Sequence, residues 1–476
     1  MRSVILFFLV LAFSIRVYGQ STQQHKVDSV FQLVKQYYNA RQPDSIYALA
    51  GEKFHAALTP ETFRYVCTSQ LFPIGAIKYA SLMSFVNNQL GTYKLEFETT
   101  NLQLQITLDD KNKIELFLFQ PFKKQVSDKL YTVASSNLLR TESDKKVDSA
   151  VQSYIKKSNT VGLSIGIVQH GKISTYNYGE TKLGNHHLPD ANTLFEIGSI
   201  SKTFTATLLA FYVNEGKLKL TDPIIKYLPD SIASNKALAD ITIETLSNHT
   251  SGLPRLPDNL GNHSMDPFDP YRDYKKNDLF TYLKTARLNS KPGEKYAYSN
   301  LAVGLLGTIL EQISGKTYEQ MVEEIICKPL NMNNTAQHLS AAQQAKFVTV
   351  YNEEGKETPA WNFATLAPCG ALRSTVNDLL NYAAAQMSTN SVDKLSGAIA
   401  LTLKVTFSDK DLQLGLGWHI IKIGGVAYYF HNGGTYGCSS FLVFDPQKNF
   451  AVVLLSNSGE SVDATGAEIV KKLQQK

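Results

Sequence analysis

The sequence predicts two folded domains: a small α+β domain, followed by a larger α/β (α+β) domain built on one antiparallel sheet. Three observations support this fold class. The 476 residues are 43% apolar and 19% charged, a globular composition with room for two or more domains. An early helical stripe gives way to alternating strands from residue 93, and strand-rich stretches at both ends of the remaining chain enclose a long helical middle.

The N-terminus has the pattern of a secretory signal peptide. Arg2 precedes the apolar run "VILFFLVLAF", and Val17-Tyr18-Gly19 follow as a small-residue cleavage site. This run is far shorter than the ~20 residues that cross a bilayer. We therefore expect residues 1–19 to be removed, the mature protein to be exported to the periplasm or secreted, and no integral membrane span.

Residues 20–122 are expected to form the small accessory domain. The apolar residues of 26–41 share one helical stripe: Val27, Val30, Phe31, Val34, Tyr37 and Tyr38. Alternating strands follow, with a turn at "DDKN" before "KIELFLF". This layout resembles the cone-shaped domains of the nuclear-transport-factor-like superfold, a fold that does not fix a function. It holds no catalytic set, and its partner stays open between docking, dimerisation and substrate presentation.

Residues 123–146, which end in the charged "TESDKK", are expected to be a linker, and 147–476 the second domain. That domain begins with a helix and a hairpin that turns at His170-Gly171. It ends with the strands "GCSSFLVFD" and "NFAVVLLSNS", joined by "DPQK", and a final helix. Strands at both ends predict one antiparallel sheet whose faces are covered by helices.

Charge and cysteine content exclude several classes of protein. The formal net charge is +5 without a dense Lys/Arg block, so we expect no nucleic-acid partner. The four cysteines lack zinc-site spacing, and His186-His187 lack a third ligand, so we expect no metal and no cofactor. One disulfide could form after export, but the sequence does not choose its pairing.

The stretch "FEIGSISKTF" (195–204) places a lysine three residues after a serine, at the start of an apolar helix. Ser199 and Lys202 share one helix face, where a desolvated lysine can act as a base toward a hydroxyl. The Ser-x-x-Lys pattern occurs four times, but only Ser199 follows a glycine and opens an apolar helix. The alternative is a helix-capping serine beside a solvated lysine.

Two further stretches carry side chains suited to acyl transfer. Tyr298 and Asn300 precede the apolar helix of "KPGEKYAYSNLAVGLLG", where a tyrosine can relay protons and an asparagine can orient an amide. His431, Gly433 and Gly434 end a strand in "YYFHNGGTYGCSSFLVF", and the glycines allow a substrate to approach free backbone N–H groups. Taken singly, the first stretch could be a helix cap with a core tyrosine, and the second a glycine hairpin with an incidental histidine.

In this order the three stretches resemble the serine penicillin-recognising enzymes, within them the class C β-lactamase, D-alanyl-D-alanine carboxypeptidase and esterase group. "YSN" matches the Tyr-x-Asn motif and "HNG" the His-x-Gly form of the third motif. "LSNHTSGLP", "PCGALRSTVNDLLNY" and "GLGWHI" are also similar, and the resemblance covers about residues 147–476. It implies an antiparallel sheet flanked by helices, plus a helical subdomain.

The resemblance also implies acyl-enzyme chemistry. Ser199 would attack a carbonyl while Lys202, kept neutral by its surroundings, takes the hydroxyl proton directly or through Tyr298; which of the two is the principal base stays open. Asn300 would orient Lys202 and the substrate amide. The N–H groups of Ser199 and Gly434 would form the oxyanion hole.

One departure from the family affects the expected substrate. Class C β-lactamases typically have a lysine in the third motif, whereas His431 carries at most a partial charge near neutral pH. This favours a D-Ala-D-Ala carboxypeptidase or esterase acting on a small amide or ester, such as a peptidoglycan-derived peptide. A true β-lactamase is one alternative, and a catalytically weak penicillin-binding sensor is another.

Three other interpretations of the sequence compete with this one. "GLSIG" (162–166) matches a nucleophile elbow, but the residues after Ser164 continue as a strand rather than a helix. A Cys438–His431 pair could be a thiol nucleophile, although a cysteine on a glycine-rich turn more often packs. An inactive site would be marked by loss of Ser199, Lys202, Tyr298 or Asn300, and all four are present.

Overall fold

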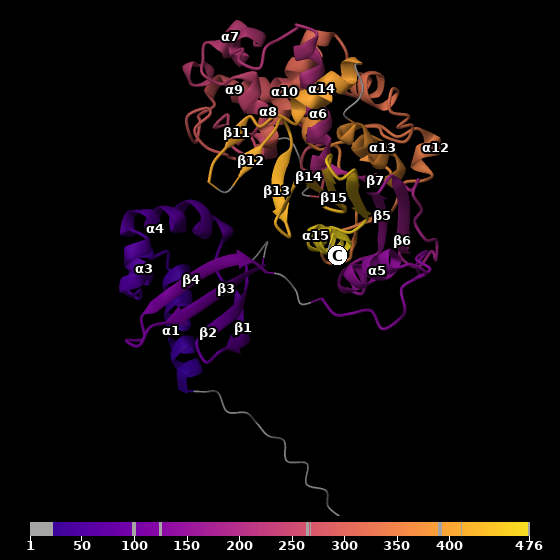
Figure 1. The fold of residues 1–476 in the computed structure, drawn as a ribbon. Coiled ribbons are helices and arrows are strands. Elements are labelled where there is room, and N and C mark those ends of the chain that lie inside the picture. The colour runs from indigo at the N-terminus through magenta and orange to yellow at the C-terminus, as the bar shows by residue number, and fades with distance from the viewer. Residues whose placement is uncertain are drawn as a thin grey trace, which may run out of the picture. The chain divides into compact units, whose positions relative to one another are not determined.

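The computed structural model describes residues 22–97, 101–122, 126–262, 266, 268–388, 393–410 and 412–474. The chain divides into two compact units, one up to Gln125 and one from Val126 (Figure 1). The signal peptide predicted for 1–19 lies outside the described residues. Among the residues that are described, no helix has the length and apolarity to cross a membrane.

The first unit packs helices on a four-stranded antiparallel sheet of order β1-β2-β3-β4. Its helices are α1 (Thr22–Asn39), α2 (Pro43–Tyr47), α3 (Glu52–Ala57) and α4 (Pro60–Val66), followed by a π-helical turn (Cys67–Leu71) and a 3-10 turn (Phe72–Ile74). Its strands are β1 (Tyr79–Val86), β2 (Leu90–Glu96), β3 (Asn101–Leu108) and β4 (Ile114–Pro121). Val27, Phe31, Val34 and Tyr38 of α1 are buried in the core, as the helical stripe predicts.

Strand β1 was not expected, and its side-chain pattern explains why. Leu82 and Phe85 are half-buried while Tyr79 and Met83 are exposed, so apolar residues occupy both faces and hide the alternation. The register also shifts between Leu82 and Ser84, where a bulge interrupts the period of two.

The second unit is built on an eight-stranded antiparallel sheet of order β11-β12-β13-β14-β15-β16-β5-β6. The two ends of the unit meet inside this sheet, because β16 pairs with β5 at Leu454↔Ile165. The expected sheet from both domain ends is therefore confirmed. The strands are β5 (Gly162–Gln169), β6 (Lys172–Gly179), β11 (Phe407–Ser408), β12 (Gln413–Leu414), β13 (His419–Ile423), β14 (Val426–Gly434), β15 (Ser439–Asp445) and β16 (Phe450–Ser456).

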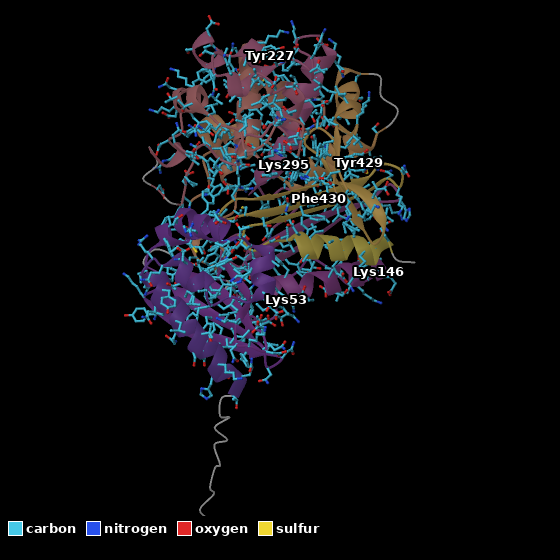
Figure 2. The ribbon with its side chains drawn as sticks, turned by 90° about the vertical axis from the view of Figure 1, so that its left-hand side faces the viewer. Lys53, Lys146, Tyr227, Lys295, Tyr429 and Phe430 are labelled. Carbon is cyan, nitrogen blue, oxygen red and sulfur yellow. The ribbon has the colours of Figure 1, made fainter. Side chains whose placement is uncertain are left out.

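Helices cover both faces of this sheet. On one face, α5 (Glu142–Ile155) and α15 (Asp463–Gln474) lie side by side (Figure 1). The other face meets the large helical core, which includes α6 (Ser201–Asn214), α10 (Asn300–Ser314) and α13 (Val376–Met387). Adjacent residues of β14 show the alternation: Tyr429 stacks on Phe444 in the helical core, whereas Phe430 contacts Phe441 on the α5–α15 side (Figure 2).

The middle of the second unit supplies the remaining elements. Its other helices are α7 (Asp230–Ala233), α8 (Ile243–Ser247), α9 (Lys276–Thr285), α11 (Tyr318–Met321), α12 (Ala341–Gln344) and α14 (Lys394–Thr402). Two short ribbons complete it: β7 (Phe195–Glu196) with β10 (Arg373–Ser374), and β8 (Val350–Tyr351) with β9 (Glu357–Thr358). All four cysteines are buried and free, so no disulfide links them in this structure.

The stretch predicted as a linker, 123–146, is folded into the second unit over much of its described length. Gly179 N–H donates to Ala134 O at 2.9 Å, and Ser136 N–H donates to Asn177 O at 2.9 Å, so this segment follows the β6 edge. Helix α5 then begins at Glu142, after a capping box formed by Thr141 and Asp144. The domain boundaries proposed from the sequence remain predictions.

Candidate active site

Ser199 lies on a 3-10 turn (Gly198–Ile200) between β7 and α6. Lys202, on the first turn of α6, is only 1% exposed. Its Nζ lies 2.9 Å from Ser199 Oγ and 2.6 Å from the carbonyl oxygen of Cys369. The buried amine thus touches the serine hydroxyl, and the backbone carbonyl fixes its position. This contact is what base activation of the hydroxyl requires.

The third sequence motif reaches the same serine through a close backbone approach. Gly198 has φ +50°, and a Cβ there would lie 2.8 Å from Gly434 N. A Cβ on Gly433 would lie 2.0 Å from Ile197 O and 2.9 Å from Ser199 N. Only glycine fits this junction between β14 and the serine turn, which brings the N–H groups of Ser199 and Gly434 into one region.

Tyr298 lies against Lys202 and two residues that the sequence analysis did not single out. Lys202 Nζ is 4.8 Å and Arg255 Cζ 5.1 Å from the centroid of the tyrosine ring. The ring of His249 lies 4.4 Å from it, centroid to centroid, and His249 Nδ1 accepts the N–H of Ser299 at 3.2 Å. Neighbouring groups therefore hold Tyr298 beside the Ser199–Lys202 pair.

Asn300 lies at the first position of α10 and is 7% exposed. Its Nδ2 donates to the Tyr271 hydroxyl at 3.1 Å, and its buried Oδ1 has no hydrogen-bond partner in the described structure. The expected contact with Lys202 is thus not made; Asn300 is bonded to Tyr271 instead. The unpaired oxygen leaves an acceptor for an amide N–H.

His431 is a neutral side chain at this site. It is 1% exposed, its Nδ1 lies 2.6 Å from the carbonyl oxygen of Asn432, and its Nε2 has no hydrogen-bond partner among the described residues. Burial, with the nearby His419 and Lys202, holds the pKa of His431 well below its usual range. The third motif therefore carries a polar but uncharged group at this position.

His419 extends this polar cluster. Its ring lies 5.4 Å from that of His431, and its Nε2 is 3.0 Å from the Tyr296 hydroxyl. Burial, together with Lys202, lowers the pKa of His419 to about 4. The stretches "LSNHTSGLP" and "GLGWHI" carry His249 and His419, so the sequence held a signal for both residues, but spacing alone could not place them beside Lys202.

The rival sites do not assemble. Ser164 is fully buried within β5, which runs into a hairpin rather than a helix. Cys438 is also buried, which raises the pKa of its thiol well above the usual value and disfavours a thiolate. His186 pairs with Glu180 at 2.9 Å. In the described part of the chain, no three His, Cys, Asp or Glu residues are grouped to hold a metal ion.

The second unit of the chain is similar to known proteins. The family model described as Beta-lactamase matches residues 147–476. A "Beta-lactamase" of Pseudomonas fluorescens is 27% identical over 67% of this chain and 94% of its own length. The "D-alanyl-D-alanine-carboxypeptidase/endopeptidase AmpH" of Escherichia coli (strain K12) is 30% identical over 66% of this chain and 83% of its own.

Solved structures show the same fold. A "Beta-Lactamase/D-Alanine Carboxypeptidase from Pseudomonas syringae" superposes with a TM-score of 0.63 at 24% identity, covering 70% of this chain and 99% of that one. A structure described as "A class C beta-lactamase" gives a TM-score of 0.63 at 25% identity, covering 72% and 99%.

Proposed function

The chain belongs to the beta-lactamase family of serine hydrolases, and from this premise we propose that it is an exported D-Ala-D-Ala carboxypeptidase or esterase. The observation that carries the proposal is the contact of 2.9 Å between buried Lys202 Nζ and Ser199 Oγ. Export rests on the leader-like residues 1–19. The proposed substrate is a small amide or ester, such as a peptidoglycan-derived peptide.

In the proposed acylation, Ser199 Oγ attacks the substrate carbonyl carbon while its hydroxyl proton passes to Lys202, directly or through Tyr298. The oxyanion of the tetrahedral intermediate accepts hydrogen bonds from the N–H groups of Ser199 and Gly434. Losing one such donor typically raises the barrier by ~2.7–4 kcal/mol. The intermediate collapses when the leaving group takes a proton from Tyr298, which yields the acyl-enzyme.

Deacylation would reverse these roles. Tyr298 and Lys202 would take a proton from an incoming water, whose oxygen attacks the acyl carbonyl, and Ser199 Oγ leaves with a proton. The unpaired Oδ1 of Asn300 suits the N–H of a substrate amide on the acyl side. These roles rest on proximity to the Ser199–Lys202 pair.

The neutral third motif supports a peptidase or esterase over a β-lactamase. A lysine there would supply a full charge to a substrate carboxylate, whereas His431 in its buried site supplies only a neutral ring. β-Lactam hydrolysis remains the second candidate because a relative named "Beta-lactamase" matches along most of its length.

Intact-protein mass spectrometry tests the proposal, with Ser199→Ala as the matched control. The wild type is exposed separately to benzylpenicillin and to a fluorophosphonate. A stable penicillin adduct that is absent from the variant supports a penicillin-binding peptidase. Labelling by the fluorophosphonate alone, with penicillin left intact, supports an esterase, and hydrolysed penicillin supports a β-lactamase. If neither reagent labels Ser199 and penicillin stays intact, the catalytic proposal fails and a sensor role replaces it.

A further inference from the structure

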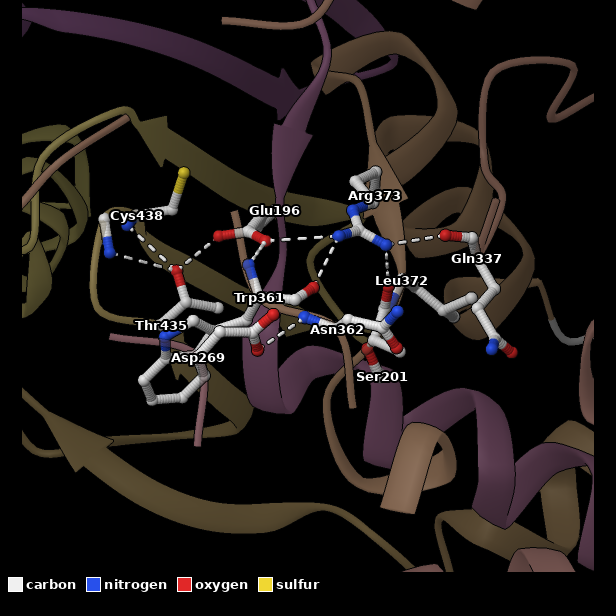
Figure 3. A network of polar contacts seen from close by, with 12 residues as sticks. Glu196, Ser201, Asp269, Gln337, Trp361, Asn362, Leu372, Arg373, Thr435 and Cys438 are labelled. Atoms are coloured by element: carbon white, nitrogen blue, oxygen red, sulfur yellow. Dashed lines mark hydrogen bonds and ion pairs between the residues drawn. The ribbon is translucent and has the colours of Figure 1, made fainter. Parts of the chain in front are cut away.

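Glu196 is a buried carboxylate three residues before Ser199 that the acyl-transfer chemistry does not use. It is 3% exposed. Its Oε1 accepts the N–H of Trp361 at 2.7 Å and faces Arg373 Nη2 at 3.4 Å, and its Oε2 accepts the Thr435 hydroxyl at 2.6 Å (Figure 3). Such a buried charge is retained only where partners satisfy it, and here each partner comes from a different segment.

Thr435 directly follows Gly434, the proposed second donor of the oxyanion hole. Its hydroxyl donates to Glu196 and accepts the N–H groups of Cys438 at 3.0 Å and Gly437 at 3.3 Å. Its own N–H donates to Cys438 O at 3.0 Å. The Thr435 side chain therefore ties the hairpin after β14 to β7, the strand that leads to Ser199.

The Thr435–Glu196 hydrogen bond lies next to the place where the backbone of β14 packs against the turn that carries Ser199. On one side Glu196 holds Thr435, and on the other Ser440 Oγ donates to Ile197 O at 2.8 Å. Between these two bonds, Gly433 and Gly434 contact the backbone of 197–199. The spacing of the two oxyanion donors is thus set by side-chain bonds as well as by the strands.

Arg373 is held beside the Glu196 carboxylate by hydrogen bonds of its own. Its guanidinium donates to Trp361 O at 2.5 Å and to Gln337 O at 2.6 Å, and β10 pairs with β7 at Arg373↔Glu196 (Figure 3). Burial raises the pKa of the Glu196 carboxyl, while Arg373 and the Thr435 hydroxyl oppose that rise. Because the Trp361 N–H and Arg373 both face Oε1, Oε2 accepts the Thr435 hydroxyl.

We propose that Glu196, acting through Thr435, is a positioning residue that sets the distance between the Ser199 and Gly434 N–H groups. This inference rests on the proposed function, because it assigns a role to groups around the same oxyanion hole. Neither residue touches the reacting atoms. Both act by holding a donor where charge develops in the transition state.

The test uses Thr435→Val, which keeps the side-chain shape and removes the hydroxyl. Glu196→Gln is not used alone, because it leaves Arg373 without a carboxylate partner. If that variant misfolded, its loss of activity would not test the positioning role. Thr335→Val is the matched control, because Thr335 Oγ1 also donates to a buried carboxylate, that of Asp378 at 2.8 Å, and its other side-chain bond is to Ser374 Oγ at 2.7 Å on β10. Thr435→Ser restores the hydroxyl.

The readouts are the rate constant of Ser199 labelling by a fluorophosphonate, kcat and KM on p-nitrophenyl acetate, and the melting temperature. Thr435→Val is expected to lower labelling and kcat by about 10–100-fold with KM within about threefold, as for a displaced catalytic donor. Thr335→Val is expected to lose comparable thermal stability but keep the wild-type labelling rate. Thr435→Ser is expected to recover most of the labelling rate that Thr435→Val loses.

The outcomes separate the two proposals. A Thr435→Val enzyme that is labelled as fast as the wild type, or no more slowly than Thr335→Val, overturns the positioning role alone. A loss that Thr435→Ser does not recover also overturns it, because the hydroxyl is then not the cause. A wild type that the fluorophosphonate never labels overturns the proposed function, and the positioning role with it.

Discussion

Gly433→Ala is expected to disable the site through one added methyl group. A Cβ at this position would lie 2.0 Å from Ile197 O and 2.4 Å from Ser440 Oγ. Real Cβ contacts begin near 3.0 Å, so β14 or the serine turn must move by about 1 Å. A displacement of that size at a catalytic constellation can lower the rate by about a hundredfold.

The cost to the fold is smaller than the cost to activity. Inserting one methyl group into a packed junction typically destabilises by about 1–3 kcal/mol, which a large unit tolerates. The variant should therefore stay folded by circular dichroism while its fluorophosphonate labelling and kcat on p-nitrophenyl acetate fall about a hundredfold.

Gly261→Ala is the control for this substitution. A Cβ at Gly261 would meet no atom within 4 Å, so this variant should keep wild-type labelling and melting temperature. The reasoning is refuted if folded Gly433→Ala is labelled within about threefold of the wild-type rate, since the backbone contact would then not set the geometry of the oxyanion hole.

Three further predictions address the base, the pH dependence and the metal. Lys202→Met fills the same buried site without an amine, so labelling of Ser199 should slow by about 10²–10⁴-fold, the usual contribution of a general base; an unchanged rate would exclude Lys202 from that role. Because the pKa of His419 falls from 6.5 to about 4 on folding, the unfolded state binds more protons below pH 6.5. In urea unfolding, the free energy of unfolding of the wild type minus that of His419→Asn should be constant above pH 7 and fall by up to about 3 kcal/mol between pH 6.5 and 4. A difference that does not change with pH would contradict a neutral buried ring. Treatment with EDTA should leave ester hydrolysis within twofold, and a loss that Zn²⁺ restores would contradict a metal-free mechanism.

The apolar periodicities of the sequence determined the fold class and the elements near the ends of the two units. The stripe of α1, the hairpin of β5 and β6 and the final strands all follow from residues that are neighbours in the chain, because helix and strand periods are local properties. The same holds for Ser199 and Lys202, whose spacing of three places them on one face. Strand β1 escaped detection because its apolar residues occupy both faces.

Only the tertiary structure decided which distant groups meet. The Glu196–Thr435 bond spans 239 positions, and Lys202 reaches the carbonyl of Cys369 across 167. Asn300 bonds to Tyr271 instead of Lys202, and His249 packs on Tyr298, which no spacing rule predicts. Contacts of this kind depend on how sheet and helices pack around a shared core, so a single sequence names the candidate side chains while packing fixes their distances and their charge states.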